Sequence, residues 1–275
     1  MRKTIFLILV TIFSLYPLIF AFAAVNSNFT PLYKLYNIKE VKTHYVIVVD
    51  TSLSMKPIFS TVRESLLKFS SFLSPQDSLT FITFANQPHK IYARQFNKKA
   101  LNKVLPPGPD PKGTHTDIGA AFKEAIASFK PKQEINVLIF ITDGLNDPPP
   151  QSHFQQPEVW QKLKEEVQKL NLKHLSVFGL GLNQQTDVAQ LQKVFPQPQL
   201  MTSSPKQLNQ YFQRLKTAIK QEKLKAKVEK ELKTGQVKFK VKQVKTVNRS
   251  QAQLTLAAKS SILLTAQRAT NKKGC

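Results

Sequence analysis

The chain has 275 residues, of which 41% are hydrophobic, so it can bury one large core with or without an appendage. Its 40 lysines and arginines outnumber 17 acidic residues, and the formal net charge of +23 predicts attraction to polyanions or acidic partners. The only cysteine, Cys275, excludes a disulfide framework within the chain, so stability has to come from packing or from a bound metal.

Residues 1–24 have the layout of a secretory signal peptide. Arg2 and Lys3 precede an apolar run over residues 5–20, and Ala-Phe-Ala at residues 21–23 is a small-residue cleavage pattern. An uncleaved membrane anchor is the alternative, because the apolar stretch approaches the length that spans a bilayer. In both cases we expect the remaining chain to be exported, to a periplasm, a cell envelope or the medium. Residues 25–42 are then a lead-in to the folded domain.

From residue 43 onward, short apolar runs alternate with segments of helical periodicity. Strands are predicted at residues 45–49, 78–85, 90–96, 135–141 and 174–182. Helices are predicted at residues 58–73, 97–104, 118–129 and 157–170, at 186–194, and from 205 onward. This alternation predicts an α/β fold, with a doubly wound, open and mostly parallel sheet that carries helices on both faces.

The composition changes after about residue 215. Between Lys206 and Lys245 there are 13 basic residues against 3 glutamates, which predicts a basic helical extension over residues 221–235. Short alternating runs follow and predict a small β appendage over residues 236–275. Two or three short strands bury little by themselves, so the appendage is expected to pack on the main domain or on a partner.

Two of the predicted strands end in carboxylates. Asp50 follows one apolar run and Asp143 follows another, so both should lie at the carboxyl edge of the sheet, where open parallel sheets bind ligands. Ser52 and Ser54 alternate with Asp50, and side chains two apart point the same way as a strand leaves the sheet. Thr114 lies at the same rim, in a proline- and glycine-rich loop before a helix.

Two carboxylates and three hydroxyls form an all-oxygen set of ligands, which suits Mg²⁺, Mn²⁺ or Ca²⁺ better than zinc or copper. Taken alone, Ser52 or Ser54 has a simpler explanation as the cap of the following helix. The five histidines show no metal-binding helical spacing.

The strings DTSLSM, GTHTDIGAA and ITDGLND resemble the von Willebrand factor type A domain over roughly residues 43–220. That family has a metal-ion-dependent adhesion site of the form DxSxS, then Thr, then Asp. The resemblance implies that Asp50, Ser52, Ser54, Thr114 and Asp143 bind Mg²⁺ in a Rossmann-like domain. It also implies that the ion bridges to an acidic residue of a partner protein. Thr116 is a second candidate for the threonine ligand, and Thr116 and His115 are candidate partner contacts.

Three classes of function are compatible with these features. The first is a non-enzymatic, metal-dependent adhesion or interaction module. The second is binding of an anionic envelope or membrane surface through the basic C-terminal region, with export arguing against nucleic acid as the partner. The third is a metal-assisted hydrolase, which is disfavoured because no phosphate-binding glycine-rich loop and no general base are recognisable.

Overall fold

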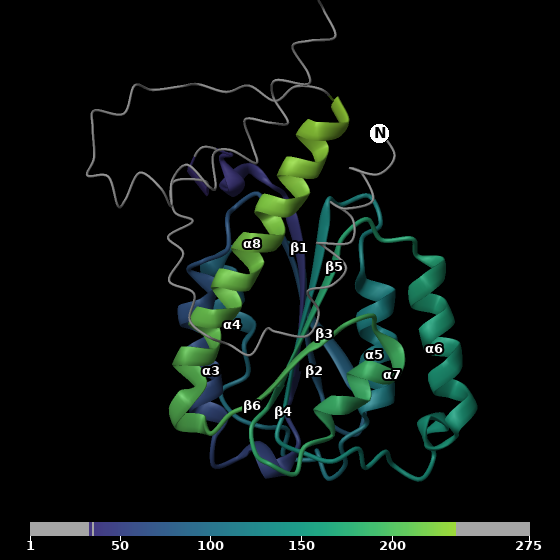
Figure 1. Cartoon of the computed structure of the whole chain (residues 1–275). Helices are drawn as coiled ribbons and strands as arrows, with labels where there is room; N and C mark the ends of the chain where they lie inside the picture. Colours follow the sequence, from purple (N-terminus) through teal and green to yellow (C-terminus); the bar gives the residue numbers. More distant parts are fainter. Residues whose placement is uncertain (1–32, 35, 235–275) are drawn as a thin grey trace, which may run out of the picture. The chain divides into compact units, whose positions relative to one another are not determined.

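The computed structural model describes residues 33–34 and 36–234, and the folded domain lies within residues 36–234 (Figure 1). The predicted signal or anchor (1–24) and the predicted β appendage (236–275) lie outside the described residues. Within the described part, no helix has the length and apolar character that crossing a membrane requires.

The sheet has six strands in the order β3-β2-β1-β4-β5-β6. Their bounds are β1 Thr43–Asp50, β2 Ser78–Phe84, β3 Pro88–Gln95, β4 Ile135–Thr142, β5 Leu175–Gly181 and β6 Gln199–Thr202. All neighbouring pairs are parallel except β2 with β3, which is the antiparallel edge. The chain builds outward from β1 to β2 and β3, and then returns to add β4 on the other side of β1. This reversal of strand order confirms the doubly wound fold.

The helices follow the predicted order, except that one predicted helix is divided. They are α3 (Phe59–Ser70), α4 (Lys98–Val104), α5 (Ile118–Ser128), α6 (Pro157–Lys169), α7 (Leu191–Val194) and α8 (Leu208–Thr234), with 3₁₀ turns η1 (Ile38–Glu40), η2 (Leu53–Met55), η3 (His153–Gln155), η4 (Asp187–Gln190) and η5 (Pro205–Gln207). The predicted helix at 186–194 is split into η4 and α7, and the short strand β6 was not predicted. The predicted boundary at residue 220 falls inside α8, which is continuous, so the basic extension is the second half of that helix.

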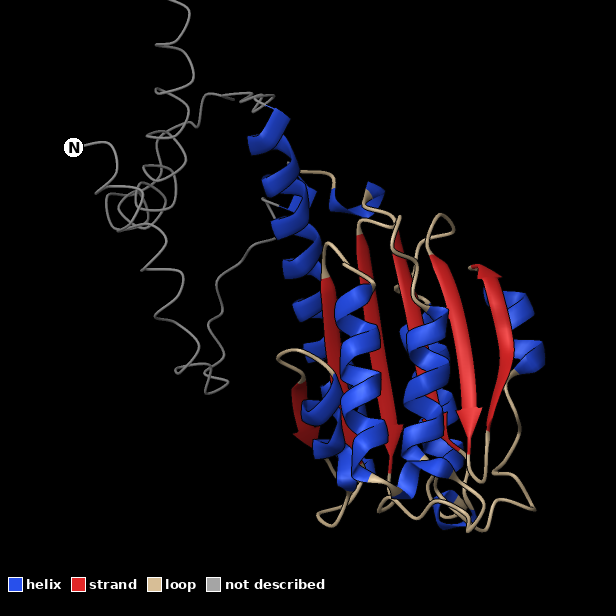
Figure 2. Cartoon of the chain, turned by 90° about the vertical axis from the view of Figure 1, so that its right-hand side faces the viewer, coloured by secondary structure: helices blue, strands red, loops and turns tan. Residues whose placement is uncertain are grey.

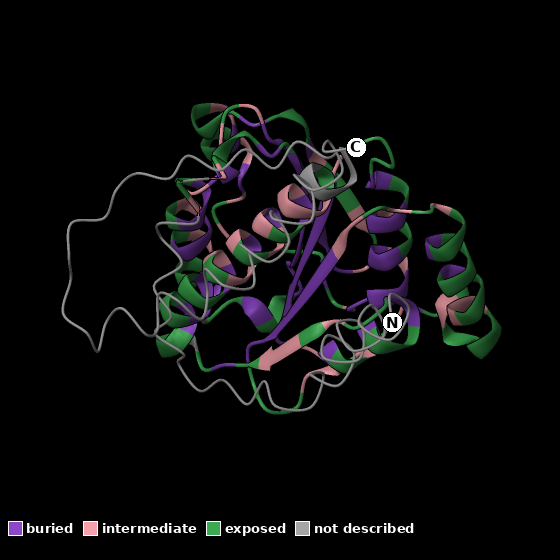
Figure 3. Cartoon of the chain, turned by 45° about the horizontal axis from the view of Figure 1, so that its top comes forward, coloured by how far each residue is buried: buried purple, intermediate pink, exposed green. Residues whose placement is uncertain are grey.

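The central strands are buried on both faces, which explains their unbroken apolar sequences. In β1, Tyr45, Ile47 and Val49 face α3, α4 and α8, whereas Val46 and Val48 face α5, α6 and α7. Figure 1 shows these two helical layers on either side of the sheet, and Figure 3 shows the buried strands between helices whose outer faces are exposed.

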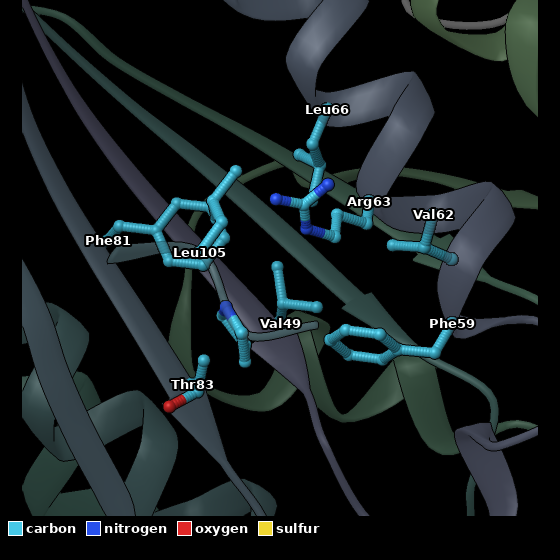
Figure 4. A pocket seen from close by; sticks show the side chains of 9 residues that line it. Val49, Phe59, Val62, Arg63, Leu66, Phe81, Thr83 and Leu105 are labelled. Atoms are coloured by element: carbon cyan, nitrogen blue, oxygen red, sulfur yellow. The ribbon is translucent and has the colours of Figure 1, made fainter. Parts of the chain in front are cut away.

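One small cavity lies within the described part of the core. A cavity beneath α3, between β1 and β2, has a volume of about 10 Å³ (Figure 4). Its lining is apolar apart from Thr83 and Arg63, and the guanidinium of Arg63 donates to Asn102 Oδ1 at 3.3 Å. A space of this size holds at most about one water molecule. An organic ligand would not fit in this cavity.

A buried ion pair fixes α8 against the amino-terminal end of the sheet. Lys223 Nζ lies 3.5 Å from Asp77 Oδ1, and the two side chains are 7% and 0% exposed. The same carboxylate accepts the backbone N–H groups of Thr43 and Ser74 at 3.0 and 2.8 Å. Burial raises the pKa of Asp77 despite the Lys223 charge, and burial lowers the pKa of Lys223 despite Asp77. Desolvation therefore exceeds the mutual attraction of the pair.

We expect the two members of this pair to differ in their effect on stability. Asp77→Ala leaves a buried ammonium and two backbone donors without an acceptor, and should lower the free energy of unfolding by about 3–5 kcal/mol. Lys223→Met should cost less, roughly 0–2 kcal/mol, because Asp77 keeps both backbone donors and can take up a proton. Urea titration of the two variants at pH 7.5 tests this order, and an equal or larger loss for Lys223→Met would contradict it.

Candidate metal site

The predicted site residues lie where the two central strands end. Asp50 is the last residue of β1 and Asp143 directly follows β4, and β1 and β4 are parallel neighbours. Their carboxyl ends therefore meet at one edge of the sheet, toward which the parallel strand arrows in Figure 2 run. This edge is the point of reversed strand order, where α/β sheets of this type bind ligands.

A chain of hydrogen bonds joins the first loop to the second carboxylate. The backbone N–H of Ser52 donates to Asp50 Oδ1 at 2.8 Å, which turns the chain back over the end of β1. Ser52 Oγ and Ser54 Oγ are 2.9 Å apart, and Ser54 Oγ donates to Asp143 Oδ1 at 2.8 Å. Residues 89 positions apart in the sequence are thus in direct contact.

The interpretation of Ser52 as a simple helix cap is wrong. Ser52 precedes η2, but its side chain makes no capping hydrogen bond to that turn. Its hydroxyl is directed to Ser54 instead.

The other oxygen of Asp50 is held by a residue that the sequence analysis missed. Thr142 Oγ1 donates to Asp50 Oδ2 at 2.6 Å and accepts the N–H of Gly144 at 3.1 Å. Because Thr142 is the last residue of β4, this contact ties the end of β4 to the end of β1. The signal for it was present in the sequence, since Thr142 immediately precedes Asp143.

Both carboxylates are removed from water. Asp50 is 0% exposed and Asp143 is 8% exposed. The pKa of Asp50 is raised to about 6, chiefly by burial; the hydrogen bonds of Ser52 and Thr142 lower it, and the nearby charge of Asp143 raises it. Burial likewise raises the pKa of Asp143, opposed by the hydrogen bond from Ser54. Two buried anions this close repel each other, and a bound cation would relieve both penalties.

The two candidate threonines differ in their surroundings. Thr114 is exposed, and its side chain makes no hydrogen bond within the described part of the chain. Thr116 is buried, and its Oγ1 would lie 3.3 Å from a Cβ placed on Gly144, with Asp50 Oδ2 3.6 Å from the same point. The Thr116 hydroxyl therefore lies on the same side of Gly144 as the Asp50 carboxylate, while Thr114 lies farther out on the same loop.

The loop that carries both threonines is fixed from several sides. The N–H of Leu53 donates to Gly113 O at 2.9 Å, and a Cβ on Gly113 would come within 2.8 Å of Ala85 Cβ, so the close approach requires glycine. Asn86 donates to Lys112 O and accepts the N–H of His115, each at 2.8 Å. The first and second loops are thereby held together.

The loop after β4 is hydrogen-bonded to the loop before α5 and to the loop after β5. Thr116 and Asp147 exchange two backbone hydrogen bonds of 2.9 Å, and His115 Nδ1 lies 3.1 Å from Asp147 Oδ2. The side-chain amide of Asn183 donates to the carbonyl of Asp143, which fixes the backbone of that residue. Asn183 follows β5, the neighbour of β4, so the same strand-end logic that located Asp50 would have located it.

The chemistry of these donors fits a hard dication. Two carboxylates balance a 2+ charge, and the neighbouring hydroxyls of Ser52 and Ser54 supply neutral oxygens. Among the described residues, no group of three or more His, Cys, Asp or Glu side chains could hold a metal. The site therefore depends on hydroxyl oxygens to complete its donor set.

Comparisons with known proteins agree with this architecture. The model of the von Willebrand factor type A domain matches residues 45–227. Among solved structures, the PilB minor pilin from Streptococcus sanguinis matches with a TM-score of 0.54 at 12% identity, over 66% of this chain and 62% of the pilin. Proximal thread matrix protein 1 from the mussel byssus, in a structure with zinc in its metal-ion-dependent adhesion site (MIDAS) motif, also matches. Its TM-score is 0.52 at 16% identity, over 65% of this chain and 46% of the mussel chain.

At these identities the solved structures support the fold alone. The chain spans less than two thirds of the length of either protein. No curated protein sequence matches the chain significantly.

The raised pKa of Asp50 predicts that its charge destabilises the domain when no metal is bound. The pKa of Asp50 is about 6 in the folded domain and 3.8 as its ordinary value. Its contribution to the stability of the fold is therefore fully present below pH 3.8 and is lost as the pH rises through about 6. In EDTA at pH 7.5, Asp50→Asn should therefore be more stable than the wild type by roughly 1–3 kcal/mol. The difference should vanish toward pH 4, as measured by urea unfolding at both pH values. A variant less stable than the wild type at pH 7.5 would contradict this account.

Proposed function

Because this chain belongs to the von Willebrand factor type A domain family, we propose that it is an exported, non-enzymatic protein that binds a protein partner through a metal ion. Domains of this family commonly mediate protein–protein interactions and typically bind a divalent metal at the position described above. In the proposed site, Mg²⁺ is held by Asp50, Ser52, Ser54, Thr114 and Asp143. Mn²⁺ and Ca²⁺ are chemically acceptable substitutes.

The observation that carries the proposal is the contact between loops distant in sequence. The hydrogen bonds from Ser52 to Ser54 and from Ser54 to Asp143 bring side-chain oxygens of two loops to one place. Asp50 lies beside them, fixed on one oxygen by Ser52 and on the other by Thr142. Preorganised oxygens of this kind cost little further ordering when a cation binds.

Each residue has a defined role in the proposal. Asp50 and Asp143 supply the negative charge, and the two serines supply neutral oxygens. Thr142 orients the Asp50 carboxylate and Asn183 holds the backbone carbonyl of Asp143, as outer-shell partners do at metal sites. The bound dication would offer the partner a positive charge, which suits an exposed Asp or Glu of another protein.

Export is part of the proposal. It is supported by the sequence of residues 1–24, where two cations, an apolar run and a small-residue pattern follow one another. An exported chain with this charge would act in a periplasm, at a cell envelope or outside the cell. The same segment, uncleaved, would anchor it to a membrane.

The hydroxyls of the site are used as ligands in this proposal and not as nucleophiles. Ser54 donates to a carboxylate, and Ser52 is paired with Ser54, so neither serine contacts a histidine or lysine that could serve as its base. This arrangement supports a binding function over hydrolysis.

A second candidate function rests on the charge of α8. Along this helix, burial and the nearby charge of Lys220 lower the pKa of Lys216, which indicates crowded positive charge. Lys206, Arg214 and Lys225 are exposed on η5 and α8, whereas Lys223 is buried and paired. This side of the domain would suit an anionic lipid surface or envelope polymer.

The leading proposal predicts one divalent-cation site per chain. Calorimetry of the full chain with Mg²⁺ or Mn²⁺ should show binding that Asp50→Ala and Asp143→Ala weaken at least about a hundredfold. The reason is that loss of an outer-shell partner alone already costs 10- to 100-fold. Thr142→Val should fall within that smaller range. Absence of binding by Mg²⁺, Mn²⁺, Ca²⁺ and Zn²⁺, or binding that survives Asp50→Ala, would refute the site.

A matched pair of variants decides which threonine of the second loop binds the metal. If Thr114 is the ligand, Thr114→Val weakens metal binding and Thr116→Val leaves it within about twofold. The reverse result would transfer the role to Thr116, whose hydroxyl and the Asp50 carboxylate both lie beside Gly144.

Salt and chelator distinguish the two functions. Binding to phosphatidylcholine–phosphatidylglycerol vesicles through α8 should survive EDTA and fall steeply between 50 and 200 mM salt. Replacing Lys206, Lys216 and Lys225 by glutamine should weaken it about a hundredfold, because each lysine near such a surface contributes about 1 kcal/mol. Vesicle binding that is unaffected by these substitutions would exclude α8 as the contact.

A further inference from the structure

Two exposed leucines flank the candidate metal site. In the described part of the chain, Leu53 and Leu145 are the large hydrophobic residues that are exposed, at 42% and 56%. Leu53 lies between the serines of the first loop, and Leu145 lies two residues after Asp143. Because Ser54 donates directly to Asp143, the two leucines belong to loops in contact. Single exposed leucines are common on protein surfaces, but here both occur at one site.

Leu53 is held on a rigid turn. Its own N–H donates to Gly113 O at 2.9 Å, and its carbonyl accepts the N–H of Lys56 at 3.1 Å. Its neighbours Ser52 and Ser54 are joined through their hydroxyls. The backbone is therefore fixed on both sides of a side chain that remains in water.

Leu145 is held in a similar way by one aspartate. The N–H of Asp187 donates to Gly144 O at 3.1 Å, and Asp187 Oδ2 accepts the N–H of Asn146 at 2.9 Å. Asp187 is thus hydrogen-bonded to the residues immediately before and after Leu145. An apolar side chain on a preorganised backbone loses little entropy when a partner covers it.

The polar surroundings of the leucines indicate the charge of that partner. Lys56 and Lys112 are exposed, and they lie two residues after Ser54 and two before Thr114. Asp147, the exposed acid of this region, is paired with His115. Cations beside an apolar pair favour an acidic segment over a basic or neutral one.

We propose that Leu53 and Leu145 form an apolar contact surface that selects a protein segment in which the acidic residue is flanked by bulky apolar side chains. This inference rests on the proposed function, since the acidic residue is the one that the metal ion would bind. The leucines supply affinity and specificity, whereas the carboxylates and hydroxyls hold the metal. The two contributions are therefore separable by substitution.

The test starts from an unbiased probe. A random peptide library displayed on phage is selected on the immobilised full chain in Mn²⁺ and eluted with EDTA. We expect the eluted peptides to contain Asp or Glu next to Leu, Ile, Val, Phe or Met. The best peptide should then bind Leu53→Ser and Leu145→Ser about five- to twentyfold more weakly than the wild type, the effect of losing most of a buried leucine.

Two measurements show that the leucine variants act at the contact surface alone. Calorimetry with Mn²⁺ should give the same metal affinity within about twofold, and thermal unfolding should be unchanged. Leu224→Ser serves as the matched control, because this partly exposed leucine lies on α8 next to Lys223, at the other end of the sheet. It should bind the peptide like the wild type.

The outcomes separate the inference from the proposed function. Acidic peptides without apolar neighbours, or equal binding by the leucine variants, would overturn the inference and leave the metal-dependent function standing. If Mn²⁺ binds but EDTA elutes no peptide, the inference fails together with the protein partner of the proposed function. Metal-dependent binding to phosphatidylcholine–phosphatidylglycerol vesicles that Leu145→Ser abolishes would overturn it in favour of a membrane surface.

Discussion

The structure depends on the burial of two carboxylates at the end of adjacent strands. Asp50 and Asp143 are shielded from water and linked by the backbone N–H of Ser52 and the hydroxyls of Ser52 and Ser54, and the pKa of Asp50 rises to about 6 because burial penalises its charge. At neutral pH this arrangement is costly without a cation and favourable with one. A bound cation would offset this cost, and the hydrogen bond from Ser54 to Asp143 joins the two loops that follow β1 and β4.

Strand β1 connects this site to the rest of the domain, since each of its ends carries the hydrogen bonds of a buried aspartate. At the carboxyl end Asp50 is oriented by Thr142 of β4, and at the amino end Asp77 accepts the N–H of Thr43 and pairs with Lys223 of α8. Both contacts are made by side chains from other elements. The central strand is thereby fixed in position along its length, and the loop that leaves it starts from a fixed point.

The loops beyond the strands combine rigidity with exposure. A backbone hydrogen bond holds Leu53 to Gly113, and Asp187 is hydrogen-bonded to both neighbours of Leu145. The backbone that carries these two exposed side chains is therefore fixed. Leu53 lies between Ser52 and Ser54, whose hydroxyls contact each other, and its own side chain is exposed. The candidate metal-binding oxygens and the exposed leucine thus belong to one turn.

The sequence alone determined the order of strands and helices, because apolar runs and helical periodicity depend on local pattern. It also determined that Asp50, Ser52, Ser54 and Asp143 would meet, because parallel strand ends share one edge of a sheet. Thr142 and Asn183 stand at strand ends in the sequence, but what they contact, like the contacts of Asp187, depends on which strands become neighbours. The short strand β6 was not predicted, because it is stabilised by pairing with β5. Only the tertiary structure placed Lys223 against Asp77 and left two leucines exposed, because burial is set by contacts between segments far apart in the chain.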